Sequence, residues 1–312
     1  MGHADPSPLS LTGRPHIPVG PISQQARERR PMRHQMKLYG LTFSLPLLIW
    51  QLLFFVFPLV FLVALSFWTV KNFAMQPDFD TVNWATMYGR RVFWQAYGTT
   101  FALAASASVL TSILAFPAAY AIAFKMSETA RRWAVFLMVI PFFTSYLVRV
   151  YSWQIFLSDN GIVNAILGSV GLGPIPMLNT VGATIIGYLT LSFPLVVLLQ
   201  LFSLVFIDRT LIEAAHNLRC GRVRTVFAVV IPSARVGLVI AALFCFILSF
   251  GDFVSPIYLG GGDPTTLSIL ITDTTKSGQQ WPRAAVIALT MIGTLMLVAF
   301  AAVKFAYRGR AK

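Results

Sequence analysis

Long apolar stretches alternate with shorter polar ones along most of this chain. A bilayer hydrocarbon core about 30 Å thick requires roughly 20 apolar residues in one helix. Six stretches meet this requirement, and they predict spanning helices near 44–69, 97–124, 133–153, 181–206, 236–258 and 284–306. Pro58, Pro117 and Pro194 fall inside predicted helices. Spanning helices tolerate proline, because neighbouring groups satisfy the carbonyl that proline leaves unpaired.

The polar segments differ in character. Residues 1–37 are rich in proline, serine, glycine and arginine and lack apolar periodicity, which predicts a disordered basic tail rather than a cleavable signal peptide. Residues 70–96 carry aromatic side chains typical of a membrane interface and predict a short surface helix. Glycine and proline in 154–180 and 259–283 predict loops on the same, external side. Residues 38–312 are therefore expected to form one membrane domain.

Composition and charge support a polytopic membrane protein. Hydrophobic residues make up 56% of the chain and charged residues 11%, whereas about a quarter of a soluble domain is charged. The net charge of +13 follows the predicted topology: 18 of the 24 Lys and Arg lie on the side of the two termini and of residues 208–234. By the positive-inside rule, both termini are cytoplasmic. We expect an all-α integral membrane protein with six transmembrane helices, in contact with the lipid bilayer and with no nucleic acid.

The sequence offers no pattern for a metal site or a nucleotide site. Cys220 and Cys245 have neither disulfide nor metal-ligand spacing, and three of the four histidines lie in the N-terminal tail. The glycines of 260–262 lack the Lys-Ser/Thr pair of a phosphate-binding loop. We therefore expect no catalytic residue, no metal and no cofactor in this chain, and any ATP and magnesium would be bound by a partner.

The most specific polar segment is 208–234, which lies between two predicted spans on the predicted cytoplasmic side. Thr210 and Glu213 have the spacing of a capping box, which predicts that a helix begins at Thr210. Gly221 is expected to end this helix in a left-handed turn, and Pro232 to fix where the next segment breaks. The prediction for this segment is helix, turn, helix.

This segment resembles the EAA loop of the membrane-spanning subunits of ABC importers, by which such permeases engage their ATPase. The resemblance lies in Glu213-Ala214-Ala215 and in Ile231-Pro232, at the family's spacing. The family usually has glycine six residues after the glutamate, where this chain has Arg219, and we interpret this as a turn shifted to Gly221. The alternative is that Glu213 only caps a helix while the basic residues face anionic lipid. The residues assigned to ATPase coupling are Thr210, Glu213, Ala214, Ala215, Arg219, Gly221 and Pro232.

Apart from Lys304 at the C-terminal end of the last one, two charged residues fall within predicted spans, and they mark a candidate substrate pathway. A charge near the bilayer centre costs on the order of 2.5–3.5 kcal/mol, so such residues usually face a cavity or a partner. Asp252 with aromatic faces suits a protonated amine, whereas Arg149 suits an anionic group. Alternatively, Arg149 reaches the outer headgroups and Asp252 makes a structural hydrogen bond to a kinked neighbour near Gly251 and Pro256. The candidate pathway comprises Arg149, Tyr151, Trp153, Phe250, Asp252, Phe253 and Tyr258.

The stretches that begin at Arg149 and at Gly251 are similar to permeases of the spermidine/putrescine branch of ABC importers. This resemblance implies a type I importer permease of the bacterial inner membrane, whose last five helices, about 95–306, form the transport core. It also implies two ATPase subunits, a second permease and a periplasmic substrate-binding protein as partners. The implied substrate is a polyamine or a related small amine, with opines and organophosphonates as alternatives.

Two other functional classes remain as alternatives. A secondary transporter or channel would more often have repeated halves, helices broken at matching positions or several buried ionisable groups. A membrane-embedded enzyme would need His, Asp, Glu, Cys or Ser at catalytic spacing. Neither pattern is visible in the sequence.

Overall fold

A computed structural model describes residue 2 and residues 44–308, so the tail predicted over 1–37 lies outside the described residues. The chain divides after Val60 into two units, which are described separately. The first described helix, Ser44–Leu65, begins in the first unit and matches the predicted span near 44–69. It contains the π-helical turn η1 (Leu52–Val56), directly followed by α2 (Phe57–Leu65) with Pro58 near its start. A proline cannot donate to the helical ladder, and this accounts for the local irregularity.

The segment after α2 contains a hairpin that the sequence did not predict. Strands β1 (Thr69–Lys71) and β2 (Ala74–Gln76) pair antiparallel, with Thr69 opposite Gln76. Asn72 and Phe73 form the two-residue turn with positive φ at both positions, as a type I′ turn requires. The short surface helix expected within 70–96 is present as α3 (Val82–Tyr88).

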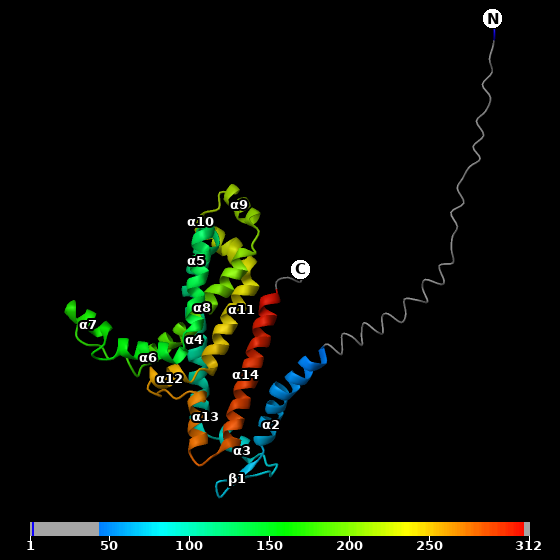
Figure 1. The fold of residues 1–312 in the computed structure, drawn as a ribbon, viewed down its shortest axis with the longest axis vertical. Coiled ribbons are helices and arrows are strands. Elements are labelled where there is room, and N and C mark those ends of the chain that lie inside the picture. The colour runs from blue at the N-terminus through cyan, green and yellow to red at the C-terminus, as the bar shows by residue number, and fades with distance from the viewer. Residues whose placement is uncertain (1, 3–43, 309–312) are drawn as a thin grey trace. The chain divides into compact units, whose positions relative to one another are not determined.

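Three long helices form the centre of the second unit (Figure 1). They are α4 (Arg91–Phe124), α8 (Val181–Val205) and α11 (Ile231–Gly251), and each packs against the other two. Alanine is frequent among the buried residues of α4, which allows close helix approach in the absence of a hydrophobic force between helices. The last helix, α14 (Trp281–Tyr307), packs on α11 and on α13 (Leu267–Lys276).

The predicted helix over 133–153 is broken, so that prediction is wrong. Helix α5 (Glu128–Val139) ends in the 3₁₀ turn η2 (Ile140–Phe143), and the chain then bends by 94° into α6 (Tyr146–Leu157) and α7 (Ile162–Ser169). Pro141 lies in the first turn of η2, and Thr144 after it is extended. Figure 1 shows α6 and α7 leading away from the central helices.

The predicted helix over 236–258 is also broken. Helix α11 ends at Gly251, Asp252 is extended, and a separate short helix, α12 (Val254–Tyr258), follows. At its other end, α11 continues from α10 (Arg222–Thr225) through the π-helical turn η3 (Val226–Val230), which gives a membrane-length helix over Arg222–Gly251. Asp252 therefore lies just beyond a spanning helix rather than inside one.

Five described helices are long and apolar enough to cross a membrane, and the bent pair of α5 and α6–α7 gives a sixth if it counts as one span. The helical membrane fold is confirmed, although the sixth span is not a continuous helix. Within the second unit, α9 (Arg209–Asn217) and α10 lie at one end of the central helices, and α3 and α13 lie at the other (Figure 1). The loop that carries Glu213 thus lies at the opposite end of the central helices from α3 and α13.

Candidate functional site

Helix α9 is capped by Asp208 and not by Thr210, so the predicted capping box is wrong. The Oδ1 atom of Asp208 accepts a hydrogen bond from the backbone N–H of Thr210 at 2.9 Å, and Thr210 lies inside the first turn. Aspartate two residues earlier is the better cap, because its carboxylate also interacts favourably with the helix dipole. The backbone hydrogen bond from Thr210 lowers the pKa of the exposed Asp208 carboxyl.

Arg219 forms part of the C-terminal cap of α9. Arg219 has φ +56°, its N–H donates to the carbonyl of His216 at 2.9 Å, and the Cys220 N–H donates to the carbonyl of Ala215 at 3.0 Å. These two bonds define a Schellman motif, with arginine at the left-handed position that glycine usually takes. Gly221 has φ −63° and precedes α10, so the interpretation of a turn shifted to Gly221 is wrong.

The surface of this loop combines exposed polar and exposed apolar side chains. Glu213 and Ala214 are exposed, whereas Ala215 is buried against the rest of the chain. Leu211, Leu218 and Val223 are also exposed, with Leu218 at 84%. Apolar side chains presented beside charged ones at the end of the bundle are typical of a surface that contacts another protein.

The loop is joined rigidly to the membrane part of the chain. Arg222 begins a continuous helix that extends to Gly251, with η3 placed directly before Pro232 in the first turn of α11. One continuous helix thus connects the α9–α10 loop with the break at Asp252. It joins the predicted coupling segment to the second group of predicted residues.

Asp252 is buried and engages three donors. Its Oδ2 atom accepts hydrogen bonds from the Tyr146 hydroxyl at 2.6 Å and from the Ser255 N–H at 3.2 Å, and its Oδ1 atom accepts one from the Val254 N–H at 2.9 Å. Only 7% of the residue is exposed. The carboxylate thus caps the start of α12, where the helix dipole favours negative charge.

The two breaks in the membrane helices meet at this carboxylate. Tyr146 is the first residue of α6, directly after the first break, and Asp252 is the second break itself. The Tyr146 hydroxyl also hydrogen-bonds to Ser255 of α12. Helix α8 approaches closely at Gly187, where a Cβ atom would clash with the Ser255 side chain. We refer to Tyr146, Asp252 and Ser255 as the break cluster.

Arg149 lies near the break cluster and is held by α8. Its Nη1 atom donates to the backbone carbonyl of Thr190 at 3.1 Å, and its guanidinium carbon is 5.8 Å from the centre of the Tyr146 ring. The guanidinium is therefore engaged within the protein. Among the described residues, Arg149 makes no ion pair with Asp252.

The remaining predicted pathway residues do not form one site. Tyr151 and Tyr258 lie together, with ring centres 5.0 Å apart, and Trp153 packs on the core beneath α6. Phe253 is half-buried at the break between α11 and α12. Phe250 is fully buried in a different core cluster, with Phe246 and residues of α14. Of the predicted pathway residues, those of α6 and α12 therefore lie close together, whereas Phe250 lies in a separate cluster.

Sequence reasoning missed Tyr146 and Ser255, because both look ordinary in an apolar stretch. The available signals were Pro141 followed by Thr144 and Ser145, and Gly251 followed by Pro256. Each pairs a proline with small or polar residues and is consistent with a helix break. Neither signal indicates that the two breaks are adjacent in space.

With this geometry established, the chain was compared with known proteins. Residues 111–310 match the family model described as the binding-protein-dependent transport system inner membrane component. The chain belongs to this family. It is accordingly a permease subunit of an ABC importer, and its several apolar helices agree with a multi-pass membrane protein. The family is one of transport permeases and not of enzymes.

The similarity to curated permeases extends beyond the matched region. This permease is 27% identical over 257 residues to the spermidine/putrescine transport system permease protein PotB of Haemophilus influenzae, which covers 80% of this chain and 89% of the relative. The predicted resemblance to spermidine/putrescine permeases is thereby confirmed.

Solved structures share its fold. One is a bacterial ABC transporter involved in import of the acidic polysaccharide alginate, with a TM-score of 0.69, 18% identity and coverage of 90% of this permease and 99% of that chain. Another is that type of transporter in complex with an alginate pentasaccharide-bound periplasmic protein, with a TM-score of 0.67, 19% identity and coverage of 91% and 98%. Both likenesses concern the fold alone.

Proposed function

We propose that this permease forms one half of the pathway of an importer for a polyamine, such as spermidine or putrescine, or for a related small amine. The similarity to a spermidine/putrescine permease over most of both chains is the observation that carries this proposal. The break cluster supports it, because its single buried carboxylate is the kind of group that stabilises a protonated amine during desolvation.

The chemistry of Asp252 leaves room for this role. An ionised carboxylate has about four lone-pair sites, and protein donors occupy three of them. The remaining site on Oδ1 can accept one N–H from an ammonium group. Two aromatic rings nearby, Tyr151 and Tyr258, add cation–π stabilisation of about 0.5–2 kcal/mol for each favourable contact.

We further propose that an ATPase docks on the α9–α10 loop. The exposed Glu213, with the exposed Leu211 and Leu218 beside it, supplies the contact surface, and the helix Arg222–Gly251 carries the movement to the break cluster. The coupling residues are those predicted, with Asp208 added as the cap. ATP and magnesium are bound by the ATPase subunits, two of which serve the complete importer.

The other proposed partners follow from the architecture of such importers. A second permease completes the pathway, and a periplasmic binding protein delivers the substrate to the end that carries α3 and α13 (Figure 1). The solved relative in complex with a periplasmic protein supports this last partner. The excess of Lys and Arg on the loop side supports cytoplasmic termini and placement in the bacterial inner membrane.

Arg149 favours a second candidate, an importer for an anionic or zwitterionic substrate such as an organophosphonate or an opine. Its Nε atom is buried without a hydrogen-bond partner among the described residues, so the guanidinium has unused donor capacity beside the break cluster. The experiment is uptake of labelled putrescine, spermidine and an organophosphonate by cells that express the complete importer. Uptake of the amines alone is expected, whereas uptake of the phosphonate alone contradicts the amine proposal.

A further inference from the structure

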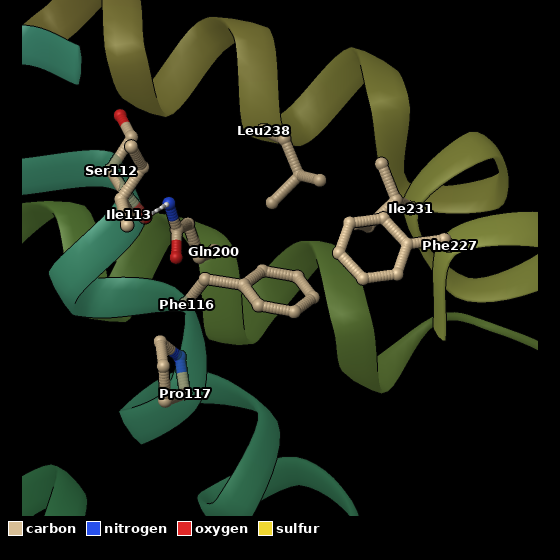
Figure 2. A pocket seen from close by; sticks show the side chains of 8 residues that line it. All are labelled: Ser112, Ile113, Phe116, Pro117, Gln200, Phe227, Ile231 and Leu238. Carbon is tan, nitrogen blue, oxygen red and sulfur yellow. Dashed lines mark hydrogen bonds between the residues drawn. The ribbon is translucent and has the colours of Figure 1, made fainter. Parts of the chain in front are cut away.

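A cavity of about 400 Å³ lies between α4, α8 and the base of α11, outside the break cluster. Its walls are mainly apolar and come from Ile113, Phe116, Phe227, Ile231 and Leu238 (Figure 2). None of the described residues that line it carries a charge. The cavity is large enough for part of a small molecule, and its walls favour an uncharged one.

Two polar side chains in the wall have a buried atom without a hydrogen-bond partner among the described residues, the Ser112 hydroxyl and the Gln200 amide oxygen. Of the two, only the amide oxygen is restricted to accepting. Gln200 is 1% exposed, and its Nε2 atom donates to the backbone carbonyl of Ser112 at 3.1 Å. Its Oε1 atom is buried and has no hydrogen-bond partner among the described residues. Figure 2 shows the amide between Ser112 and Phe116, with the oxygen turned away from Ser112. A buried acceptor left unpaired costs about 1–3 kcal/mol, so the cavity favours a ligand that brings a donor.

A second cavity, of about 490 Å³, is lined by residues of α4, α11 and α14. On α4, Phe101, Ala105 and Val109 line the second cavity, and Ile113 and Phe116 line the first. Residues spaced by three or four lie on one face of a helix, so both cavities follow one face of α4. On α11, Leu238 lines the first cavity and Ala242 and Phe246 the second. We call the two cavities together the α4–α11 groove.

The groove is open at the surface of the second unit, and the length of α8 gives its depth in a bilayer. Ile113 and Phe227, beside its mouth, are 63% and 68% exposed, so a ligand enters through an apolar opening. Gln200 lies five residues before the end of α8, about 8 Å along the axis. Because α8 is about 38 Å long and the hydrocarbon about 30 Å thick, Gln200 lies just inside the hydrocarbon on the loop side. From there the groove runs toward the bilayer centre.

We propose that the α4–α11 groove binds a single-chain amphiphile, whose uncharged O–H group donates to Oε1 of Gln200 and whose alkyl chain lies along the groove. A fatty alcohol and a protonated fatty acid share this chemistry. A diacyl phospholipid does not, because its ester carbonyls are acceptors and leave Oε1 unpaired. An ionised carboxylate is also disfavoured at Gln200, since none of the described residues that line the first cavity carries a charge.

The position of the site connects a bound ligand with the loop proposed to contact the ATPase. Phe227 belongs to η3, the turn between the α9–α10 loop and α11, and it faces the cavity opposite Phe116 (Figure 2). A bound chain packs between η3 and α4 and holds the base of the loop in place. The site thereby links the loop to the content of free amphiphiles in the surrounding leaflet.

The test uses three probes with the same chain length: 1-dodecanol, lauric acid and methyl laurate. The full-length permease in phospholipid nanodiscs is equilibrated with each probe, and the retained probe is quantified by mass spectrometry at pH 5 and pH 9. Dodecanol is expected to be retained about tenfold better than methyl laurate at both pH values, since only the alcohol satisfies the buried acceptor. Lauric acid is expected to match dodecanol at pH 5 and to lose its advantage at pH 9.

Matched variants locate the effect. Gln200→Met keeps an unbranched side chain of similar size without the acceptor and should abolish the preference for the alcohol. Thr111→Val, which removes another buried unpartnered hydroxyl on α4, should leave the preference unchanged. If Gln200→Met fails to fold, Ala105→Leu, which narrows the groove, should weaken retention of dodecanol and methyl laurate alike. Equal retention of alcohol and ester by the native chain, as expected if water satisfies Oε1, overturns the proposal, and so does a preference that survives in Gln200→Met.

Discussion

At the scale of single residues, Arg219 takes a backbone conformation that is rare for arginine, in the loop proposed to contact the ATPase. A left-handed backbone costs a non-glycine residue about 1–2 kcal/mol, yet Arg219 holds φ +56° and completes the C-terminal cap of α9. The strain persists because two backbone hydrogen bonds and the following helix fix the turn. The turn was predicted at Gly221, because glycine adopts a left-handed conformation readily and arginine rarely does.

Arg219→Gly should therefore stabilise the loop by about 1 kcal/mol, even after allowance for the greater freedom of glycine in the unfolded chain. The measurement is hydrogen exchange at the Cys220 amide, which should slow about fivefold. Gly221→Ala is the matched control, because its φ is negative and an added Cβ atom meets nothing within 4 Å. An unchanged rate in Arg219→Gly, or a large change in Gly221→Ala, contradicts the assigned turn.

Asp252 and Arg149 make opposite predictions about the substrate. Asp252→Asn removes the charge and converts one acceptor into a donor, so amine uptake should fall at least tenfold while the ATPase still assembles with the permease. Tyr146→Phe controls for the structural role, because it removes a hydrogen bond of the break cluster and keeps the charge. It should cost much less uptake than Asp252→Asn.

The same uptake assay is applied to Arg149→Gln at matched abundance in the membrane. We expect a smaller loss of amine uptake, since Arg149 contacts the carbonyl of Thr190 and no ion pair with Asp252 is present among the described residues. Full activity of Asp252→Asn together with loss in Arg149→Gln would reject the cation pathway and favour an anionic substrate.

At the scale of helices and loops, the sequence predicted where apolar segments lie but not where they break. Length and hydropathy are properties of a stretch, so all six predicted segments overlap membrane-length helices or the bent pair. A break depends on partners far away in the chain: the turn before Tyr146 is stabilised by Asp252, 106 residues later. Broken helices were also taken as a sign of a secondary transporter, and their presence here shows that breaks alone do not distinguish the classes.

The sequence likewise predicted some residues of the candidate sites and missed others. Asp252 and Arg149 were found because charges are rare in apolar stretches, and the loop was found through its resemblance to a known motif. Gln200 was missed because a single amide in an apolar run has no distinctive pattern. Its unpaired oxygen becomes evident only when the surrounding helices are in place.

Helix α9 provides a test of coupling through Glu213, which is exposed and caps nothing in the structure. Glu213→Gln should reduce both uptake and co-purification of the ATPase while the abundance of the permease stays constant. Glu213→Lys should reduce them further, since it reverses a charge at the proposed contact. Normal uptake by Glu213→Lys excludes this loop as the coupling element.

The cap of α9 should depend on pH. The pKa of Asp208 is lower in the folded loop than in the unfolded chain, where an aspartate titrates near 3.9. Its contribution is therefore complete above the unfolded pKa and is lost as the pH falls through the folded pKa. Hydrogen exchange at the Thr210 amide should accelerate in acid beyond the intrinsic pH effect. Asp208→Asn, which also caps helices, should remove this extra dependence; if it persists, the cap is not its source.

At the scale of the whole molecule, the charge asymmetry predicts which ends face the cytoplasm. Single cysteines at Ser127 and Arg222 should be shielded from an impermeant thiol reagent in intact cells, after Cys220 and Cys245 are replaced. Gly262 lies in the opposite connection, between α12 and α13, but its φ is +81° and a cysteine there would be strained. Ser277, directly after α13, is exposed and has negative φ, so Ser277→Cys should react. Labelling at Arg222 from outside contradicts the orientation and the coupling loop together.

The central claim is that this chain moves an amine only as part of an ATP-driven importer. Its most direct test is uptake of labelled putrescine by proteoliposomes with the complete importer, compared with proteoliposomes that contain this chain alone. The account predicts accumulation that requires ATP, the ATPase and the binding protein, and no uptake above background by the chain alone. Equal uptake by the chain alone and without ATP would contradict the account and identify a secondary transporter or channel.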